Sequence, residues 1–573
     1  MDEQQRRQIE ELLFAGPKKK SSFAKMLYFG ILDDSQIFPY PYLSQDQEKR
    51  TQEYLQKVQK FVDSSIDGAL IDREQNIPES VIKGLGQVGV LGMTIPTEYG
   101  GQGMSQKAYC QAVEAIARRC GSTALFVNAH QSIGLKALLL FGTEEQKKRW
   151  LKPLANGDAL AAFALTEPNA GSDASGIETR AVYDPAKKVY RLTGRKQWIT
   201  NGAIAQVLTV MAKTEDNKIT AFLVTPDMPG FKVVSPALEK VGMRGSKTAI
   251  FDLDNVEVPE ANILGPKGGG LRVCLTVLDY GRTTFGATCV GAGKYLLERA
   301  IEHARTRHQF QRPLASFALV KRKIATMAAL VYAMDATTYM TAGLVDNDVE
   351  DFMLEAAMLK VFTSDALWQI LYETMQIFGG RSFFTDEPFE RMMRDARLNM
   401  IGEGSNEVMR AFIGAVGMRD VGVQMKGVAD ALKDPFRQYD SIWRFTKQRF
   451  MGLRVPHIPV KSPLLEQEAH QLGRAIRSFG YHITKLLTYH REEILEKQLL
   501  LDRVANTAMA IYTTASVLSK LDADPARLNQ DLAKGKLFCQ LADVAIKQNL
   551  GTLFHNQDQA YESLANQLTG IHT

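Results

Sequence analysis

The chain has 573 residues and a formal net charge of +5 at pH 7, with 45% hydrophobic and 23% charged residues. This length predicts three or four domains with a large buried core, and the composition is ordinary for a soluble globular protein. A net charge so small for the length argues against general nucleic-acid binding, which needs a concentrated basic face.

The first 20 residues carry acidic side chains and no apolar core, so they predict neither a secretory signal nor a transit peptide. The initiator methionine on this acid-bearing start favours a bacterial cytoplasm over a mitochondrial matrix. No run of about 18 apolar residues occurs, so no membrane-spanning helix is expected. Residues 1–45, polar and then mixed in composition, predict an N-terminal arm.

The chain has five cysteines, Cys110, Cys120, Cys274, Cys289 and Cys539, an odd number at wide spacing. They form no Cys-x-x-Cys pair and no cluster with histidine, so the sequence predicts neither a disulfide framework nor a zinc site. Buried free thiols are expected instead.

Residues 46–160 predict an N-terminal helical domain. QEKRTQEYLQKVQKFVDSSI and YCQAVEAIARRC carry apolar residues at helical spacing, and Pro96 and the pair Gly100–Gly101 separate the helices. The pattern changes at residues 161–270, where short β-rich runs such as QVLTVMAK and KITAFLVT alternate with turn residues. These runs predict a middle antiparallel β-domain.

Long helical patterns return at residues 271–425 and predict a four-helix bundle. An extra helical domain is predicted over residues 426–573, which include a Pro-rich stretch at 455–463. The predicted fold class is therefore α+β and mainly α. Its order of elements lacks the strand–helix alternation of a doubly wound sheet.

Two motifs in the β-domain carry polar groups that could bind a ligand. AAFALTEPNAGSD places Thr166 and Ser172 on a turning backbone, which can offer N–H and hydroxyl groups to a flat polar ligand or a phosphate. An ordinary turn is the alternative. QWITNG follows, with the flat face of Trp198 and the hydroxyl of Thr200.

Three further motifs lie in or beside the bundle. RTRHQF carries Arg307, whose guanidinium suits a pyrophosphate, and Phe310. MQIFGG carries Gln376 and ends in two glycines, which an ordinary helix C-terminus would also explain. GPKGGG, at residues 265–270, lacks the GK[ST] ending of a phosphate-binding loop and predicts a flexible joint.

IGEGSNEVMR isolates Glu403 between Gly402 and Gly404. Glycine costs backbone order and packs nothing, so this placement indicates that something large lies against the backbone. A solvated acid just before a helix is the simpler alternative, because helix N-termini favour acids.

In order and spacing, the LTEPNAGSD, WITNG, TRHQF, QIFGG and EGSN motifs resemble those of the acyl-CoA dehydrogenases, over about residues 50–420. SFAKMLYFGILDDSQIFPYP, at residues 22–41, and the C-terminal extension are similar to the very-long-chain branch. The resemblance implies FAD-dependent conversion of a long- or very-long-chain acyl-CoA to the trans-2-enoyl-CoA in fatty acid β-oxidation. It also implies electron-transfer flavoprotein as electron acceptor and a homo-oligomer, expected to be a dimer.

The resemblance assigns the α-proton base to Glu403 and the hydride acceptor to flavin N5. Some members carry the base in an LDxxR stretch, which here is LDYGR with Gly281 at the acidic position. The residues implied for FAD are Phe163, Leu165, Thr166, Gly171, Ser172, Trp198, Ile199, Thr200, Arg307, Phe310, Gln376, Gly379, Gly380, Ser405 and Glu407. Those implied for the substrate are Ser172, Asp279, Tyr280, Arg282 and Gly404, and no metal is implied.

The chain departs from the family pattern at a few positions. Gly402 stands where an aromatic residue is common, and Gln311 and Ser382 each replace a usual glycine. Gly402 gives weight to an alternative function, a catalytically weak scaffold or assembly protein on the same fold. Gly134 fits the small residues that open a deep acyl channel in the very-long-chain branch, whereas Ala137 stands where a second glycine is usual.

The segment at residues 440–463 mixes aromatic and basic side chains, with no acid between Asp440 and Glu466. A basic amphipathic stretch can lie on anionic lipid, so peripheral membrane contact is one expectation. The alternative is that its aromatic residues dock the extra domain onto the bundle.

Overall fold

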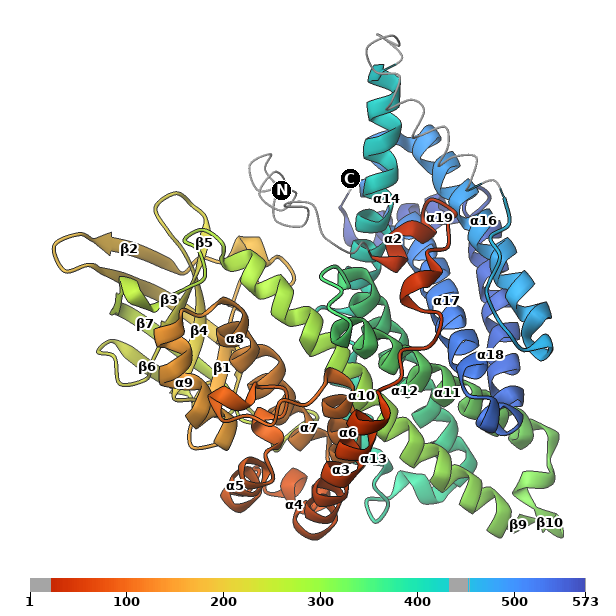
Figure 1. The fold of residues 1–573 in the computed structure, drawn as a ribbon, viewed down its shortest axis with the longest axis horizontal. Coiled ribbons are helices and arrows are strands. Elements are labelled where there is room, and N and C mark those ends of the chain that lie inside the picture. The colour runs from red at the N-terminus through yellow and green to blue at the C-terminus, as the bar shows by residue number, and fades with distance from the viewer. Residues whose placement is uncertain (1–21, 432–451, 453, 572–573) are drawn as a thin grey trace.

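The computed structural model of this chain describes residues 22–431, 452 and 454–571. Figure 1 shows the β-domain at one side of the molecule, the first helices next to it, and the long helices of the bundle and the C-terminal extension on the other side. This arrangement confirms the expected fold class, α+β and mainly α.

The first helical part contains α3 (Gln45–Ser65), α4 (Gly68–Arg73), α5 (Glu79–Val88), α6 (Gln106–Ala117), α7 (Gly121–Val127), α8 (Lys136–Phe141) and α9 (Glu144–Asn156). A π-helical segment, Asn128–Leu135, joins α7 to α8. Such segments are rare inside helices and are frequent at functional sites. Capping boxes begin α3 at Ser44 and α9 at Thr143, so the sequence itself sets where these two helices start.

The β-domain contains β1 (Ala161–Ala164), β2 (Arg180–Asp184), β3 (Val189–Thr200), β4 (Val207–Lys213), β5 (Ile219–Val224), β6 (Phe231–Ser235), β7 (Thr248–Pro259) and β8 (Ile263–Leu264). The strand order is β6-β7-β3-β2-β4-β5-β8, and β1 pairs with β4. Most neighbours are antiparallel, as expected, but β1 and β2 each run parallel to β4. Both faces of β4 and β5 are buried, since every residue of β5 and all but the last of β4 are inaccessible.

The bundle consists of α10 (Gly270–Thr306), α11 (Ala318–Asp346), α12 (Met353–Phe378) and α14 (Asn406–Ala431). A hairpin of β9 (His308–Gln309) and β10 (Arg312–Pro313) separates α10 from α11, and α13 (Phe389–Asn399) precedes α14. The turn between α13 and α14 carries the residues 400–405. The catalytic candidate Glu403 therefore lies on a short loop between two helices that are both fixed by packing.

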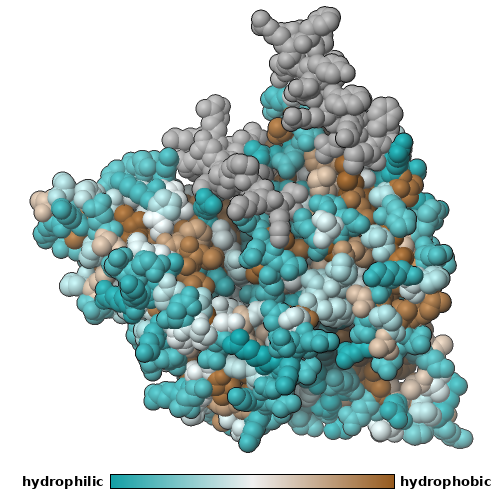
Figure 2. All heavy atoms as spheres, in the orientation of Figure 1, coloured by the Kyte–Doolittle hydropathy of each residue, from teal (hydrophilic) through white to brown (hydrophobic). Residues whose placement is uncertain are grey.

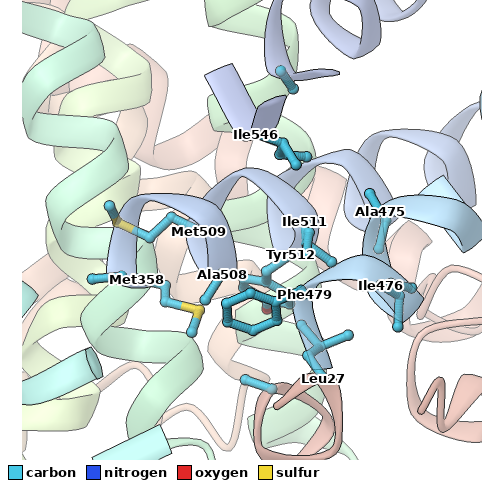
Figure 3. Close-up of a cluster of buried hydrophobic side chains, with 14 of the residues drawn as sticks. Leu27, Met358, Ala475, Ile476, Phe479, Ala508, Met509, Ile511, Tyr512 and Ile546 are labelled. Atoms are coloured by element: carbon cyan, nitrogen blue, oxygen red, sulfur yellow. The ribbon is translucent and has the colours of Figure 1, made fainter. Parts of the chain in front are cut away.

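The C-terminal extension contains α16 (Glu466–His490), α17 (Gln498–Ala523), α18 (Pro525–Gly551) and α19 (Asp558–Thr569). It shares one hydrophobic core with the bundle. Figure 3 shows part of this core, where Met358 of α12 meets Phe479 of α16 and Tyr512 of α17. The extension is therefore not a separate appendage, because its apolar faces are covered by α11, α12 and α14.

The described part of the N-terminal arm is also built into this core. Phe23, Leu27 and Tyr28, on or next to α2 (Phe23–Leu27), are fully buried. The Ser22 hydroxyl donates to the buried Glu355 carboxylate at 2.7 Å, and the Tyr28 hydroxyl donates to the Ile413 carbonyl at 2.8 Å. From residue 22 onward, the predicted arm is thus a structural element of the helical core.

All five cysteines are free and buried, which confirms the prediction made from their spacing. Among the described residues, the helical stretch Gly121–Phe141 is long and apolar enough to cross a membrane by composition, and 72% of its most apolar window is buried inside the protein. A core helix passes the same test. The face seen in Figure 2 is mainly hydrophilic, with apolar residues in scattered groups.

Candidate functional site

The loop that carries Glu403 is held in an uncommon backbone conformation. Glu403 and Gly404 have φ values of 56° and 97°, in the left-handed region that disfavours residues other than glycine. The buried Lys360 ammonium donates to the Gly404 carbonyl at 2.6 Å and to Asn406 Oδ1 at 2.8 Å. Arg282 Nε donates to the Glu403 carbonyl at 3.3 Å. These contacts from α10 and α12 hold the loop against its backbone strain.

The two glycines beside Glu403 serve different needs. A Cβ at Gly404 would lie 2.7 Å from the Met409 Cε, and its φ of 97° also requires glycine. A Cβ at Gly402 would meet only Leu398, at 3.5 Å or more. Packing therefore demands glycine at 404 but leaves room for a side chain at 402.

The Glu403 carboxyl group is poised to exchange a proton near neutral pH. Burial raises its pKa to about 7, although the charges of Arg282 and Lys360 and a hydrogen bond from Asn128 each lower it. Asn128 Nδ2 donates to Oε1 at 2.9 Å. Oε2 is buried and has no hydrogen-bond partner among the described residues. One carboxylate oxygen is thus held and the other is available to a reacting group.

Gly281 of α10 bounds the space in front of that free oxygen. A Cβ built at Gly281 would lie 2.9 Å from Glu403 Oε2 and 3.1 Å from the Ile133 Cδ1. Positions 281 and 403, the two places where family members carry the base, therefore border the same space. Only Glu403 supplies a carboxylate there.

The loop after β1 is anchored by a buried ion pair. Lys196 and Glu167 have side chains that are 0% and 2% exposed, with Nζ and Oε1 2.6 Å apart. Lys196 also donates to the Leu165 carbonyl at 3.0 Å, and Glu167 accepts from the Thr179 N–H at 3.1 Å. Burial lowers the Lys196 pKa to about 8, and the pair with its hydrogen bonds keeps the pKa of Glu167 below its ordinary value. The pair fixes the loop that carries Thr166 and Ser172.

Trp198 presents its indole on the outside of the β-domain. It is 62% exposed and has a φ of 58°, next to a register shift between β3 and β7 after Lys196. Bulges of this kind re-aim a side chain and occur beside active sites. Ile199, in contrast, is 2% exposed and its side chain lies in the sheet core, so only its backbone is available to a ligand.

A second group of the predicted residues lies on the bundle. Arg307 and the 86% exposed Phe310 are on the β9–β10 hairpin, where the φ of 62° at Gln311 explains why glycine suits that position. Gln376, Gly379 and Gly380 line a cavity of about 450 Å³ with Trp368, Tyr372, Phe383 and other neighbours. Nothing lies within 4 Å of a Cβ built at either glycine.

Matches to known families cover most of the chain. The acyl-CoA dehydrogenase N-terminal, middle and C-terminal domains match residues 48–158, 162–256 and 268–418, and the ACAD9/ACADV C-terminal domain matches residues 463–570. The very long-chain specific acyl-CoA dehydrogenase of Bos taurus is 34% identical over 94% of this chain and 85% of its own length. The chain belongs to the acyl-CoA dehydrogenase family.

Other members of the family resemble the chain over its full length. The probable acyl-CoA dehydrogenase FadE10 of Mycobacterium tuberculosis is 32% identical, over 99% of this chain and 91% of that protein. The crystal structure of an acyl-CoA dehydrogenase complexed with FAD from Bacillus anthracis has a TM-score of 0.77 at 28% identity, and covers 94% of this chain and 91% of that one. These matches confirm the family and the very-long-chain branch predicted from the motifs.

The residues present fit the dinucleotide expected of an acyl-CoA dehydrogenase. The indole of Trp198 is exposed, and the loop after β1 is open at Gly171, where the nearest atom to a Cβ is the Thr166 Cγ2 at 3.9 Å. The open glycines at 379 and 380 and the exposed Arg307 leave space and positive charge for the phosphate-linked half. Ser382, another departure from the family pattern, donates to the Met375 and Gly379 carbonyls and closes α12.

The residues predicted for the substrate lie in different surroundings. Arg282 and Asp279 are buried and paired at 3.0 Å, so Arg282 supports the Glu403 loop and lowers the pKa of that carboxyl. Tyr280 is partly exposed, with the Lys136 ammonium 4.7 Å from its ring. Ser172, Ser405 and Glu407 lie at accessible positions.

Four residues that the motifs did not single out contribute to the site: Asn128, Lys360, Glu167 and Lys196. The charged residue in the apolar helical run AAMLKVF was the available signal for Lys360. The acyl-channel expectation for Gly134 stays a prediction, and the structure shows a packing reason for glycine at this position. A Cβ there would lie 2.9 Å from the Ala161 Cβ, so glycine allows the helix to approach β1.

Gly281→Ala is expected to lower the rate of substrate-dependent flavin reduction by about 10²-fold. Its methyl group would push the Glu403 carboxylate aside, and a misplacement of about 1 Å in an active site can reduce the rate by this factor. The rate is measured by stopped-flow absorbance under anaerobic conditions. Gly293→Ala on the same helix is the matched control, since its Cβ would meet nothing closer than 3.5 Å. Full activity of Gly281→Ala would show that the base does not act from the observed position.

Proposed function

We propose that this chain catalyses the FAD-dependent α,β-dehydrogenation of long- or very-long-chain acyl-CoA thioesters to trans-2-enoyl-CoA in fatty acid β-oxidation. The observation that carries the proposal is the Glu403 carboxyl group, which is buried, has a pKa of about 7 and keeps Oε2 unpartnered among the described residues. A carboxylate with these properties is a competent base for a weakly acidic carbon.

In the proposed reaction, Glu403 Oε2 takes the α-proton while Oε1 keeps its hydrogen bond from Asn128. The Glu403 backbone N–H, which donates to no described residue, polarises the thioester carbonyl as charge develops on its oxygen. Bound FAD would supply at N5 the acceptor for the hydride that leaves the β-carbon. Thr166 and Ser172 on the anchored loop, with Trp198 and Thr200, orient the ring system, and burial excludes water from the carboxylate.

We also propose that a second copy of the chain completes the cofactor site. The loop residues and Trp198 belong to the β-domain, whereas Arg307, Phe310 and Gln376 lie on the bundle. In Figure 1, β3 and the β9–β10 hairpin are on opposite sides of the molecule. A single dinucleotide would therefore take its flavin contacts from one chain and its adenosine contacts from another, which supports a homodimer.

Electron-transfer flavoprotein is the proposed electron acceptor. The proposed length of the acyl chain follows from the likeness to the very-long-chain branch.

The predicted membrane-contact segment lies mostly outside the described residues, because the structure does not describe 432–451 and 453. The compartment stays a prediction, bacterial cytoplasm over mitochondrial matrix, since the relatives are named both as mitochondrial and as mycobacterial proteins.

The function is tested by adding acyl-CoAs of graded length to the purified yellow protein without oxygen and following the visible absorption of the flavin. Rapid bleaching by long-chain acyl-CoA is expected, with the optimum giving the chain-length preference. The rate should rise with pH through about 7, because the base must be ionised and burial sets its pKa there.

A protein that keeps FAD oxidised with every acyl-CoA would favour the scaffold alternative. The Glu403 carboxylate argues against the scaffold alternative, because Asn128 still holds it in place despite the open space beside Gly402. Replacing Gly402 with an aromatic residue would then show whether the missing side chain accounts for the lost activity.

A further inference from the structure

Asn128 occupies the junction between α7 and the π-helical segment, directly against the Glu403 carboxyl group. Its Nδ2 lies 2.9 Å from Glu403 Oε1 and 3.4 Å from the Gly281 carbonyl oxygen. The side chain is 1% exposed, so its contacts are made out of water. No motif singled this residue out, since it lies 275 positions before Glu403 in the sequence.

The amide of Asn128 is incompletely satisfied, which indicates a role other than packing. Its Oδ1 is buried without a hydrogen-bond partner among the described residues. A buried polar group left unpaired costs the folded state more than an apolar side chain of the same shape would. The chain nevertheless keeps an amide here, and the shorter of its two hydrogen bonds goes to the carboxylate that the proposed reaction uses.

The other groups facing Glu403 act on its backbone and on its charge, and none of those described donates to its carboxylate. Arg282 of α10 and Lys360 of α12 donate to backbone carbonyls of the loop, and they lower the pKa of Glu403 through space. The Tyr109 hydroxyl of α6 is bonded to Ser132 at 3.0 Å. In the part of the chain that the structure describes, Asn128 alone donates a hydrogen bond to the Glu403 carboxylate.

Asn128 begins the π-helical segment, which is fastened to its neighbours by side-chain hydrogen bonds. Wider turns carry Gln131 and Ser132 toward neighbouring elements, where Gln131 Oε1 accepts from the Thr94 N–H and Ser132 meets Thr284 of α10 at 3.0 Å. These contacts fix the segment on α10 and on the loop before α6. Asn128 is therefore held on a rigid element, as it must be if it is to position the Glu403 carboxylate accurately.

We propose that Asn128 is a positioning residue that holds one oxygen of Glu403 and so aims the other at the α-carbon of the substrate. The inference rests on the proposed dehydrogenase function. A donor to the ionised form also favours the carboxylate over the carboxylic acid, so Asn128 keeps a buried base ionised near neutral pH. The amide thus serves both the direction and the charge state of the base.

The test compares Asn128→Leu, which keeps the volume and removes the amide, with the wild-type holoenzyme. Flavin reduction by palmitoyl-CoA is followed by anaerobic stopped flow across a pH range on both sides of neutrality. We expect the midpoint of the rate profile to move up by about one pH unit, which corresponds to losing one hydrogen bond to a charged group. The rate at pH 7 then falls about five-fold from ionisation alone, and this part recovers at high pH. The loss of aim adds a decrease that persists at high pH and keeps the rate there below that of wild type.

Asn399→Leu is the matched control. Asn399 is 1% exposed, its Oδ1 is also unpartnered among the described residues, and it lies four positions before Glu403. Its Nδ2 donates to the Cys289 Sγ at 3.6 Å and does not reach the carboxylate. This variant should leave the midpoint of the profile unchanged whatever it does to stability.

A profile in Asn128→Leu that falls equally at every pH, with an unchanged midpoint, would overturn the proposal, because a packing defect alone gives that result. Infrared difference titration provides a readout that needs no turnover. The Glu403 carboxyl band, identified by its loss in Glu403→Gln, should titrate at higher pH in Asn128→Leu than in wild type. If no acyl-CoA reduces the wild-type flavin, the proposed function fails, and the infrared titration still decides whether Asn128 controls the carboxyl group.

Discussion

Glu403→Gln is expected to slow the reduction of bound flavin by long-chain acyl-CoA by about 10²- to 10⁴-fold, the range that a positioned general base contributes. Glutamine keeps the size of the side chain, and its carbonyl can accept the hydrogen bond that Asn128 Nδ2 makes at 2.9 Å. It cannot take a proton. The variant should therefore stay folded and yellow and still bind acyl-CoA, while anaerobic stopped flow shows the flavin remaining oxidised.

The same variant makes a separate prediction about stability. Burial raises the folded-state pKa of Glu403 to about 7, above the ordinary value of 4.5, so the folded protein loses stability as the pH rises through this interval. The neutral glutamine escapes that loss, and the thermal unfolding midpoint of the variant should not drop below that of wild type at pH 8. Glu53→Gln, at an exposed position on α3, is the control for both measurements. Wild-type flavin reduction by Glu403→Gln would remove Glu403 as the base.

The second large effect is expected on stability and cofactor retention. Glu167→Gln leaves the Lys196 ammonium, which is fully buried, without the carboxylate that lies 2.6 Å away. Breaking one partner of a buried ion pair costs about 3–5 kcal/mol. Because the pair anchors the loop of Thr166 and Ser172, the variant should unfold at lower temperature and release FAD more readily. Circular dichroism and the fluorescence of released flavin follow the two processes.

A neighbouring pair, between β3 and β7, provides the comparison. Arg195 and Asp252 are 2.6 Å apart, but their side chains are 51% and 32% exposed, so solvent screens the interaction. Asp252→Asn should change the unfolding temperature and the FAD content only slightly. Equal effects of Glu167→Gln and Asp252→Asn would show that burial of the Glu167–Lys196 pair is not what stabilises the loop.

The motifs predicted the family, and they mark Glu403 as the candidate base, because each one is short and its chemistry is local. The contacts that make the site work are not local. Asn128 meets Glu403 across 275 positions, and Lys196 meets Glu167 across 29. Nothing in the sequence alone connects such pairs, although a lysine inside an apolar helix and an acid inside a ligand-binding loop are each unusual enough to be examined.

Strand periodicity also gave an incomplete description of the β-domain. Alternation would place Lys196 and Trp198 on the same face, since they are two residues apart. In the structure, Lys196 is buried and Trp198 is 62% exposed, because the register shift between them turns the chain over. The parallel pairing of β1 and β2 with β4 was likewise outside what local patterns predict, since it depends on how distant strands assemble.

The burial of α2 among helices of the bundle and the extension has a consequence for how the protein is made. Phe23 packs against Tyr512, so this residue is synthesised nearly 500 residues before the partner that covers it. Until α17 is synthesised, the apolar face of α2 stays uncovered. Chains that emerge side by side can then exchange this segment. Chaperone binding at α2 during synthesis, and swapped dimers when synthesis is crowded, are the behaviours that this topology favours.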